Sequence, residues 1–106
     1  MQKNIKPPKM AKLNNTLDSE KLQKYFSITK KAIDLVESSQ MDDSRIKEAK
    51  DFLNMAKCYY SDALHFFNEN DYINAFAAIN YAHGWLDAGA RIKLFDVHDS
   101  TLFTVD

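Results

Sequence analysis

The sequence is poor in the residues that interrupt helices or cross-link chains. Its 106 residues include one cysteine, two glycines and two prolines, and the prolines are adjacent at Pro7 and Pro8. The single Cys58 excludes an intrachain disulfide and a zinc site built on several thiolates. Because no proline and only two glycines follow residue 8, the sequence favours long helices.

Long apolar segments are also absent. No apolar run approaches the roughly 18 residues that a membrane span needs, and the N-terminus lacks the apolar segment of a signal peptide. We therefore expect a soluble, cytoplasmic protein with no membrane contact. Hydrophobic residues still make up 45% of the chain, which is enough for one buried core.

Charge is distributed unevenly along the chain, although the net formal charge is −1. Residues 1–14 contain four lysines and no acidic residue, so they carry +4 and the rest of the chain carries −5. Two interpretations are open: a disordered, solvated leader, or a basic tail that contacts RNA, an acidic partner or anionic lipid. The four lysines are Lys3, Lys6, Lys9 and Lys12.

Three segments have the spacing of apolar residues that is typical of amphipathic helices, and each has a residue suited to cap its N-terminus. Short polar stretches separate them. The expected segments and their caps are Thr16–Ser39 with Thr16 or Asp18, a helix from about Ser44 with Asp43 or Ser44, and a helix from Tyr72 to about Phe95 with Asp71.

Each predicted helix has one face of residues spaced three or four apart, which indicates burial against the other helices. We expect these faces to form the core. They are Leu22, Phe26, Thr29, Ile33 and Val36 in the first helix, Ile46, Ala49, Leu53, Ala56, Tyr60, Ala63 and Phe67 in the second, and Ala75, Ile79, Ala82, Leu86 and Gly89 in the third.

Aromatic residues widen the apolar face of the second helix. Phe52, Tyr59 and Phe66 flank that face at seven-residue intervals, so the second helix has enough apolar surface for two neighbours and is expected to be central. The connection to the third helix is short, which makes these two helices antiparallel neighbours.

These features predict an all-α protein, an up-and-down three-helix bundle over residues 15–98. A disordered basic leader over residues 1–14 precedes the bundle, and a short irregular extension over residues 99–106 follows it. In that extension we expect Leu102 or Phe103 to dock on an apolar groove of the bundle.

The third helix is unusually rich in small residues. Gly84 and Gly89 lie in its interior, where each glycine destabilises the helix by about 1 kcal/mol relative to alanine. Close packing against neighbouring side chains is the first explanation. Room for a ligand or a partner helix is the alternative.

A polar strip on the third helix is the candidate binding site. Asn80, His83, Asp87 and Arg91 follow one another at steps of three and four, so they share one side of the helix. Asp87 and Arg91 have ion-pair spacing, and His83 can reach Asp87. The strip is either a boundary-face ion pair or the lining of a groove with Arg91 as its anion-binding group and His83 as its acid or base.

A metal site is not expected, although Asp62 and His65 on one helix and His83 and Asp87 on the next resemble a four-ligand set. In an antiparallel hairpin that turns near residue 70, the two pairs are displaced by about 8–10 Å at 1.5 Å per residue. They cannot share one ion. No cofactor is predicted either, because phosphate-binding, hydrolase and redox motifs are missing.

One weak catalytic motif is present. Six residues separate Arg91 from His98, a spacing that resembles the Arg-x4–6-His pattern of RNases in the HEPN superfamily, but Ile92 follows the arginine where a polar residue is usual. Such spacings arise often by chance. A catalytic hypothesis would therefore depend on convergence of His83, Asp87, Arg91 and His98 in one concave site.

Several stretches together carry a family resemblance, and the longest is the run of residues 81–91. The chain resembles an archaeal family of small helical proteins, domain of unknown function 357, over about residues 20–105. The family often has a glycine where this chain has Lys93, so the end of the third helix is expected to differ. The matching stretches are Tyr59-Tyr60-Ser61-Asp62-Ala63, Asn70-Asp71-Tyr72, Ala75-Phe76, Tyr81-Ala82-His83-Gly84-Trp85-Leu86-Asp87-Ala88-Gly89-Ala90-Arg91, Leu94-Phe95 and Leu102-Phe103-Thr104-Val105.

The resemblance implies a three-helix bundle of archaeal, cytoplasmic origin and no assigned activity. Aromatic residues exceed what three helices of this length are expected to bury, which favours a non-enzymatic interaction or self-association module with a protein partner or a second copy. The alternative is a protein associated with RNA or nucleotides through the leader lysines and Arg91, with salt-dependent binding.

Overall fold

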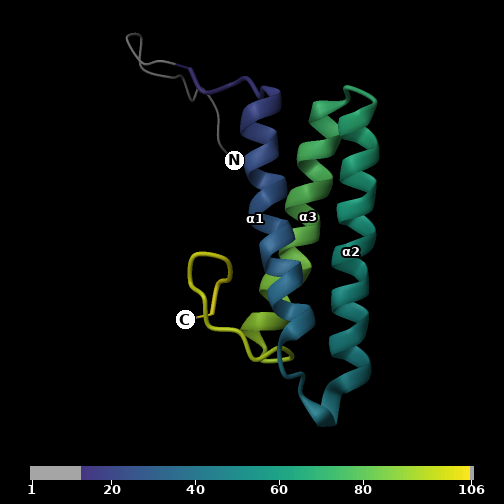
Figure 1. Ribbon diagram of the computed structural model, residues 1–106, viewed down its shortest axis with the longest axis vertical. Helices are drawn as coiled ribbons and strands as arrows, with labels where there is room; N and C mark the ends of the chain where they lie inside the picture. Colours follow the sequence, from purple (N-terminus) through teal and green to yellow (C-terminus); the bar gives the residue numbers. More distant parts are fainter. Residues whose placement is uncertain (1–12, 106) are drawn as a thin grey trace, which may run out of the picture.

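The computed structural model describes residues 13–105 and confirms the all-α three-helix bundle (Figure 1). The basic leader lysines, Lys3, Lys6, Lys9 and Lys12, lie outside the described residues. Within the described range no helix is both long enough and apolar enough to cross a membrane. The elements are α1 (Ser19–Ser38), the short 3-10 turn η1 (Asp43–Arg45), α2 (Ile46–Asn68) and α3 (Tyr72–Arg91).

Aspartate side chains cap α1 and α3, as the sequence predicted. The carboxylate of Asp18 accepts a hydrogen bond from the Lys21 N–H at 2.8 Å, and the carboxylate of Asp71 accepts one from the Asn74 N–H at 3.1 Å. Each bond satisfies a backbone N–H that has no partner inside the helix. The start of α3 at Tyr72 is therefore fixed by a contact within its own first turn.

The start of α2 differs from the prediction, because neither Asp43 nor Ser44 caps it. Asp42 accepts hydrogen bonds from both the N–H and the hydroxyl of Ser44, at 3.0 and 2.8 Å. Those bonds close the 3-10 turn, and α2 continues from it at Ile46 without a side-chain cap. The predicted cap of α2 at Asp43 or Ser44 is therefore wrong, and Asp42 caps the preceding 3-10 turn instead.

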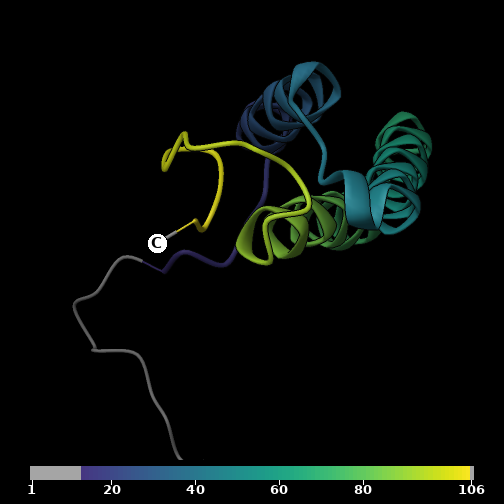
Figure 2. The same ribbon diagram turned by 90° about the horizontal axis from the view of Figure 1, so that it is seen from below.

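The central helix is α3, which corrects the prediction that the second helix is central. All five predicted core residues of α3 are buried, together with Ala78 and Ala90, whereas α2 buries only three alanines fully. Small side chains allow α1 and α2 to approach α3 from two sides. The three helices form a triangle in end view (Figure 2). Ile46, predicted to be in the core, is exposed.

The helix α3 ends at Arg91, earlier than the predicted fraying near Phe95. Lys93 has a φ of 63°, and the N–H of Leu94 donates to the Gly89 carbonyl at 2.8 Å. This Schellman arrangement closes the helix. Lys93 thereby adopts the left-handed conformation that glycine favours at this position.

The C-terminal segment returns along the bundle and completes the core. It covers the side of α1 and α3 that faces away from α2 (Figures 1 and 2). Phe103 is buried, as predicted, while Leu102 is half-buried. Leu94, Phe95 and Val97 are also buried in the same cluster as α1 and α3 residues.

Candidate functional site

His83, the centre of the predicted polar strip, joins three parts of the molecule. Its Nε2 lies 2.6 Å from the Leu102 carbonyl oxygen, and its Nδ1 lies 3.0 Å from the hydroxyl of Thr29 on α1. A carbonyl oxygen can only accept, so Nε2 carries the proton and Nδ1 of a neutral ring accepts from Thr29. His83 therefore fastens the C-terminal segment to α1 and α3.

Asp87 holds the same segment one turn further along α3. Its carboxylate accepts a hydrogen bond from the Thr104 N–H at 2.9 Å. The expected contact with His83 spans 3.9 Å, which is too long for a hydrogen bond. Among the described residues Arg91 forms no ion pair, so the predicted Asp87–Arg91 bridge is absent there. Asn80 and Arg91 are exposed.

The four residues of the catalytic hypothesis are not joined. His98 is exposed and lies 2.6 Å from an oxygen of Asp96. Within residues 13–105 no hydrogen bond or ion pair connects Arg91 or His98 with His83 or Asp87. In that same range no group of three His, Cys, Asp or Glu side chains is arranged to hold a metal ion.

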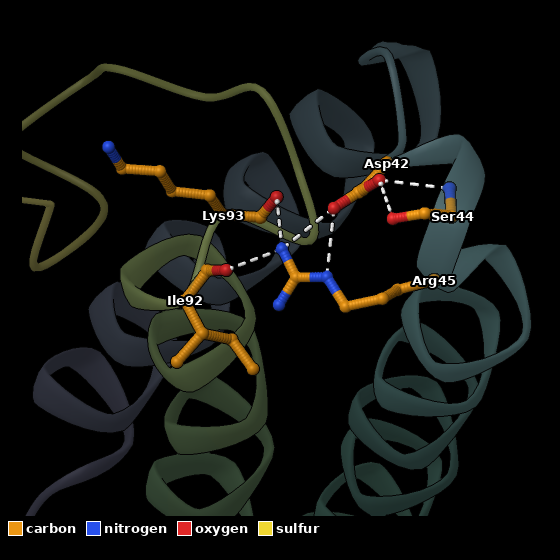
Figure 3. Close-up of polar contacts among 5 residues, drawn as sticks. All are labelled: Asp42, Ser44, Arg45, Ile92 and Lys93. Carbon is orange, nitrogen blue, oxygen red and sulfur yellow. Dashed lines mark hydrogen bonds and ion pairs between the residues drawn. The ribbon is translucent and has the colours of Figure 1, made fainter.

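A second polar cluster lies where the start of α2 meets the end of α3, and there Arg45 binds the end of α3 (Figure 3). Its guanidinium donates to the carbonyls of Ile92 and Lys93 at 2.8 and 3.3 Å and to the Asp42 carboxylate at 2.8 Å. The Ser44 hydroxyl, then Arg45, lower the pKa of Asp42 below its ordinary value of 3.8. This cluster satisfies free carbonyls at a helix end, which is a structural role.

The two glycines of α3 have opposite surroundings. A Cβ on Gly89 would lie 2.8 Å from Cζ and 2.9 Å from Cδ2 of the buried Phe95 ring. A Cβ on Gly84 would meet no atom within 4 Å. The close packing expected at both glycines therefore occurs at Gly89 but not at Gly84, because Gly84 lies on a side of α3 that no described element covers.

The uncovered side of α3 is lined by apolar residues that protrude into solvent. Ile73 is 84% exposed, Tyr81 53% and Ile92 49%. The small residues between them are exposed as well. Together with the half-buried aromatic residues at its edge, this stripe forms what we call the outer face. It consists of Ile73, Ala77, Tyr81, Gly84, Ala88 and Ile92 at the end of α3, flanked by Trp85 and by Phe52, Tyr59 and Phe66 of α2.

Two shallow hollows lie on the outer face, and Tyr81 lines both of them. Phe52, Gly84 and Trp85 line the first, and Tyr59 and Phe66 line the second. The sequence prediction assigned Phe52, Tyr59 and Phe66 to the flank of a central helix. In the structure they form the edge of an open apolar surface.

Edge-to-face contacts hold the aromatic rings of the outer face in place. The ring centroids of Tyr59 and Tyr81 are 4.5 Å apart at 87°, and those of Phe52 and Trp85 are 5.1 Å apart at 87°. The indole N–H of Trp85 is buried without a hydrogen-bond partner among the described residues. Ring contacts, rather than a polar bond, therefore fix this side chain.

The family model described as "Protein of unknown function (DUF357)" matches residues 24–95. The chain belongs to this family. The match covers all of α2 and α3, and hence most of the outer face, but stops before the segment that His83 and Asp87 hold. No curated protein and no solved structure matches the chain. Membership of DUF357 assigns no role to any residue.

Proposed function

We propose that this DUF357 protein is a non-enzymatic interaction module that binds a protein surface through the outer face. The observation that carries the proposal is Gly84. A glycine in a helix interior destabilises the helix by about 1 kcal/mol relative to alanine, and no contact within residues 13–105 requires the missing side chain. A partner that approaches the α3 backbone closely would account for it.

The composition of α3 supports the same interpretation. The helix contains only two charged residues, Asp87 and Arg91, and has apolar residues on every side. Such a helix is normally buried all round. Here α1, α2 and the C-terminal segment cover its other sides, so the outer face is the side still open to a partner.

The residue types of the outer face also match those of protein interfaces. Tyrosine, tryptophan and phenylalanine are enriched in interface cores, whereas charged residues are depleted there. Contiguous exposed apolar patches on soluble proteins mark interaction sites more often than chance. Within the part of the chain that the structure describes, Asp62 is the one charged residue that lines either hollow of the outer face.

Site-specific photo-cross-linking tests the proposal. A photoreactive phenylalanine analogue replaces Tyr81 in the full chain, and the matched control carries it at Ile28, an exposed position on α1. The proposal expects covalent capture of a protein in native extract from position 81 only, abolished by Ile73→Glu. Equal capture, or none, from the two positions would overturn it.

A further inference from the structure

We infer that the outer face binds a second copy of this chain, with the two α3 helices packed antiparallel. This inference rests on the proposed function, because it names the partner of the same surface. The order of residues along the stripe carries it. The steps from Ile73 to Ile92 are four, four, three, four and four, so the spacing is the same from either end, and the residue types also match except at Tyr81 and Gly84.

In an antiparallel pair this symmetry makes the surface complementary to itself. When Tyr81 of one copy lies beside Gly84 of the second, the same register places Ala77 beside Ala88 and Ile73 beside Ile92. A two-fold interface requires that residue i contacts j and j contacts i. Each of the three pairs therefore occurs twice in the dimer, once with each copy supplying the first residue. The bulky Tyr81 then enters the gap that Gly84 leaves, and two small residues meet on either side.

The geometry of helix packing suits this register. Both halves of the stripe follow rows of residues spaced four apart, and such rows interdigitate when helices cross at about −50°. The outer face is about 28 Å long and about two helix diameters, or 20 Å, wide. Two copies would therefore bury about 1,100 Å² in total, just above the roughly 1,000 Å² that a specific interface needs.

Charge also favours a second copy in this orientation. The stripe itself carries no charged residue, so nothing at its centre repels the same surface. Arg91 is exposed at the end of α3, and the register places it beside Asn74 and within one turn of Asp71 on the second copy. The dipoles of antiparallel neighbouring helices also point in opposite directions, which places ends of unlike partial charge side by side.

Disulfide trapping tests the register in the full chain with Cys58→Ser, since Cys58 is exposed. Tagged A77C is mixed with untagged A88C and oxidised. Cβ atoms of facing small residues lie within disulfide reach in this register, whereas positions 77 and 77 of the two copies are about 16 Å apart at 1.5 Å per residue. We expect a mixed-size covalent dimer from the mixture and none from either variant alone.

Sedimentation equilibrium of the wild-type chain accompanies the trapping. We expect a dimer whose dissociation constant rises at least about tenfold in Ile73→Glu and is unchanged in Ile28→Glu. This register is overturned if A77C alone gives a covalent dimer. It is also overturned if the chain dimerises but the mixture of A77C and A88C gives no covalent dimer. A monomer at all concentrations overturns the second copy as partner, while capture of a different protein from position 81 would still uphold the proposed function. No capture from position 81 overturns both.

Discussion

Gly89 leaves the space that the ring of Phe95 occupies. Phe95 follows the left-handed turn at the end of α3 and folds back onto the helix, where it is 2% exposed. The contact connects the end of α3 to the core and explains why a glycine is suited to this position. Gly84, five residues earlier, faces open space and provides an internal comparison.

Gly89→Ala should destabilise the protein, whereas Gly84→Ala should stabilise it. The added methyl at position 89 displaces a buried ring, and overpacking of about 1–3 kcal/mol exceeds the gain in helix propensity. At position 84 the methyl meets no other atom, so only the gain in helix propensity of about 0.5–1 kcal/mol remains. Urea unfolding at low protein concentration compares the two variants. Equal shifts of the same sign would contradict the described packing.

Lys93→Gly should raise the free energy of unfolding by about 1 kcal/mol, because a side chain in the left-handed region strains the backbone. Lys93 has a φ of 63°. The control is Lys50→Gly, an exposed position within α2, where glycine should lower stability by about 1 kcal/mol. Thermal unfolding distinguishes the two. Loss of stability in Lys93→Gly would show that the Schellman turn is not formed.

His83→Ala should release the C-terminal segment and lower the free energy of unfolding by about 1–3 kcal/mol, because the Thr29 hydroxyl and the Leu102 carbonyl lose a partner. His98→Ala, which removes only an exposed contact with Asp96, should change it by less than about 0.5 kcal/mol. Limited proteolysis provides a second readout, because cleavage in the segment after residue 98 should be faster in His83→Ala than in His98→Ala. Equal protection of both variants would mean that His83 does not hold the segment.

Acid should weaken the cluster in which Asp42 binds Ser44 and Arg45. The folded pKa of Asp42 lies below its ordinary value of 3.8, so its contribution to stability is full above about that pH and is lost as the pH falls through the folded pKa. Carboxyl NMR titration should show the lowered pKa. In Arg45→Ala the pKa should rise and still remain below the ordinary value, because the Ser44 hydroxyl is the larger cause. A pKa of Asp42 at or above 3.8 in the wild-type chain would contradict the hydrogen bonds described.

Local signals in the sequence were sufficient for much of the fold. Asp18 and Asp71 lie just before apolar periodic segments, and both cap a helix in the structure. The core face of α3 was also predictable, since its residues repeat with the helical period and all are buried. The prediction that Asp43 or Ser44 caps α2 was wrong, because Asp42, an equally suitable capping residue, caps a 3-10 turn that precedes the helix.

Features that depend on distant contacts were not predictable. A helix that is apolar on every side does not reveal which side stays open. Phe52, Tyr59 and Phe66, which edge the outer face, were therefore interpreted as the flank of a central second helix. The role of His83 depends on Leu102, nineteen residues away. The sequence gives no sign of that contact, because the spacing of His83, Asp87 and Arg91 fits an ion-paired helix face equally well.

The central claim is that a second copy covers the outer face, and the single tryptophan of the chain reports on it directly. Trp85 lies on that face, so dimerisation should reduce quenching of its fluorescence by acrylamide. We predict that quenching falls as the protein concentration rises from nanomolar to micromolar in the wild-type chain and in Ile28→Glu, but not in Ile73→Glu. Quenching that is independent of concentration in all three would contradict the claim.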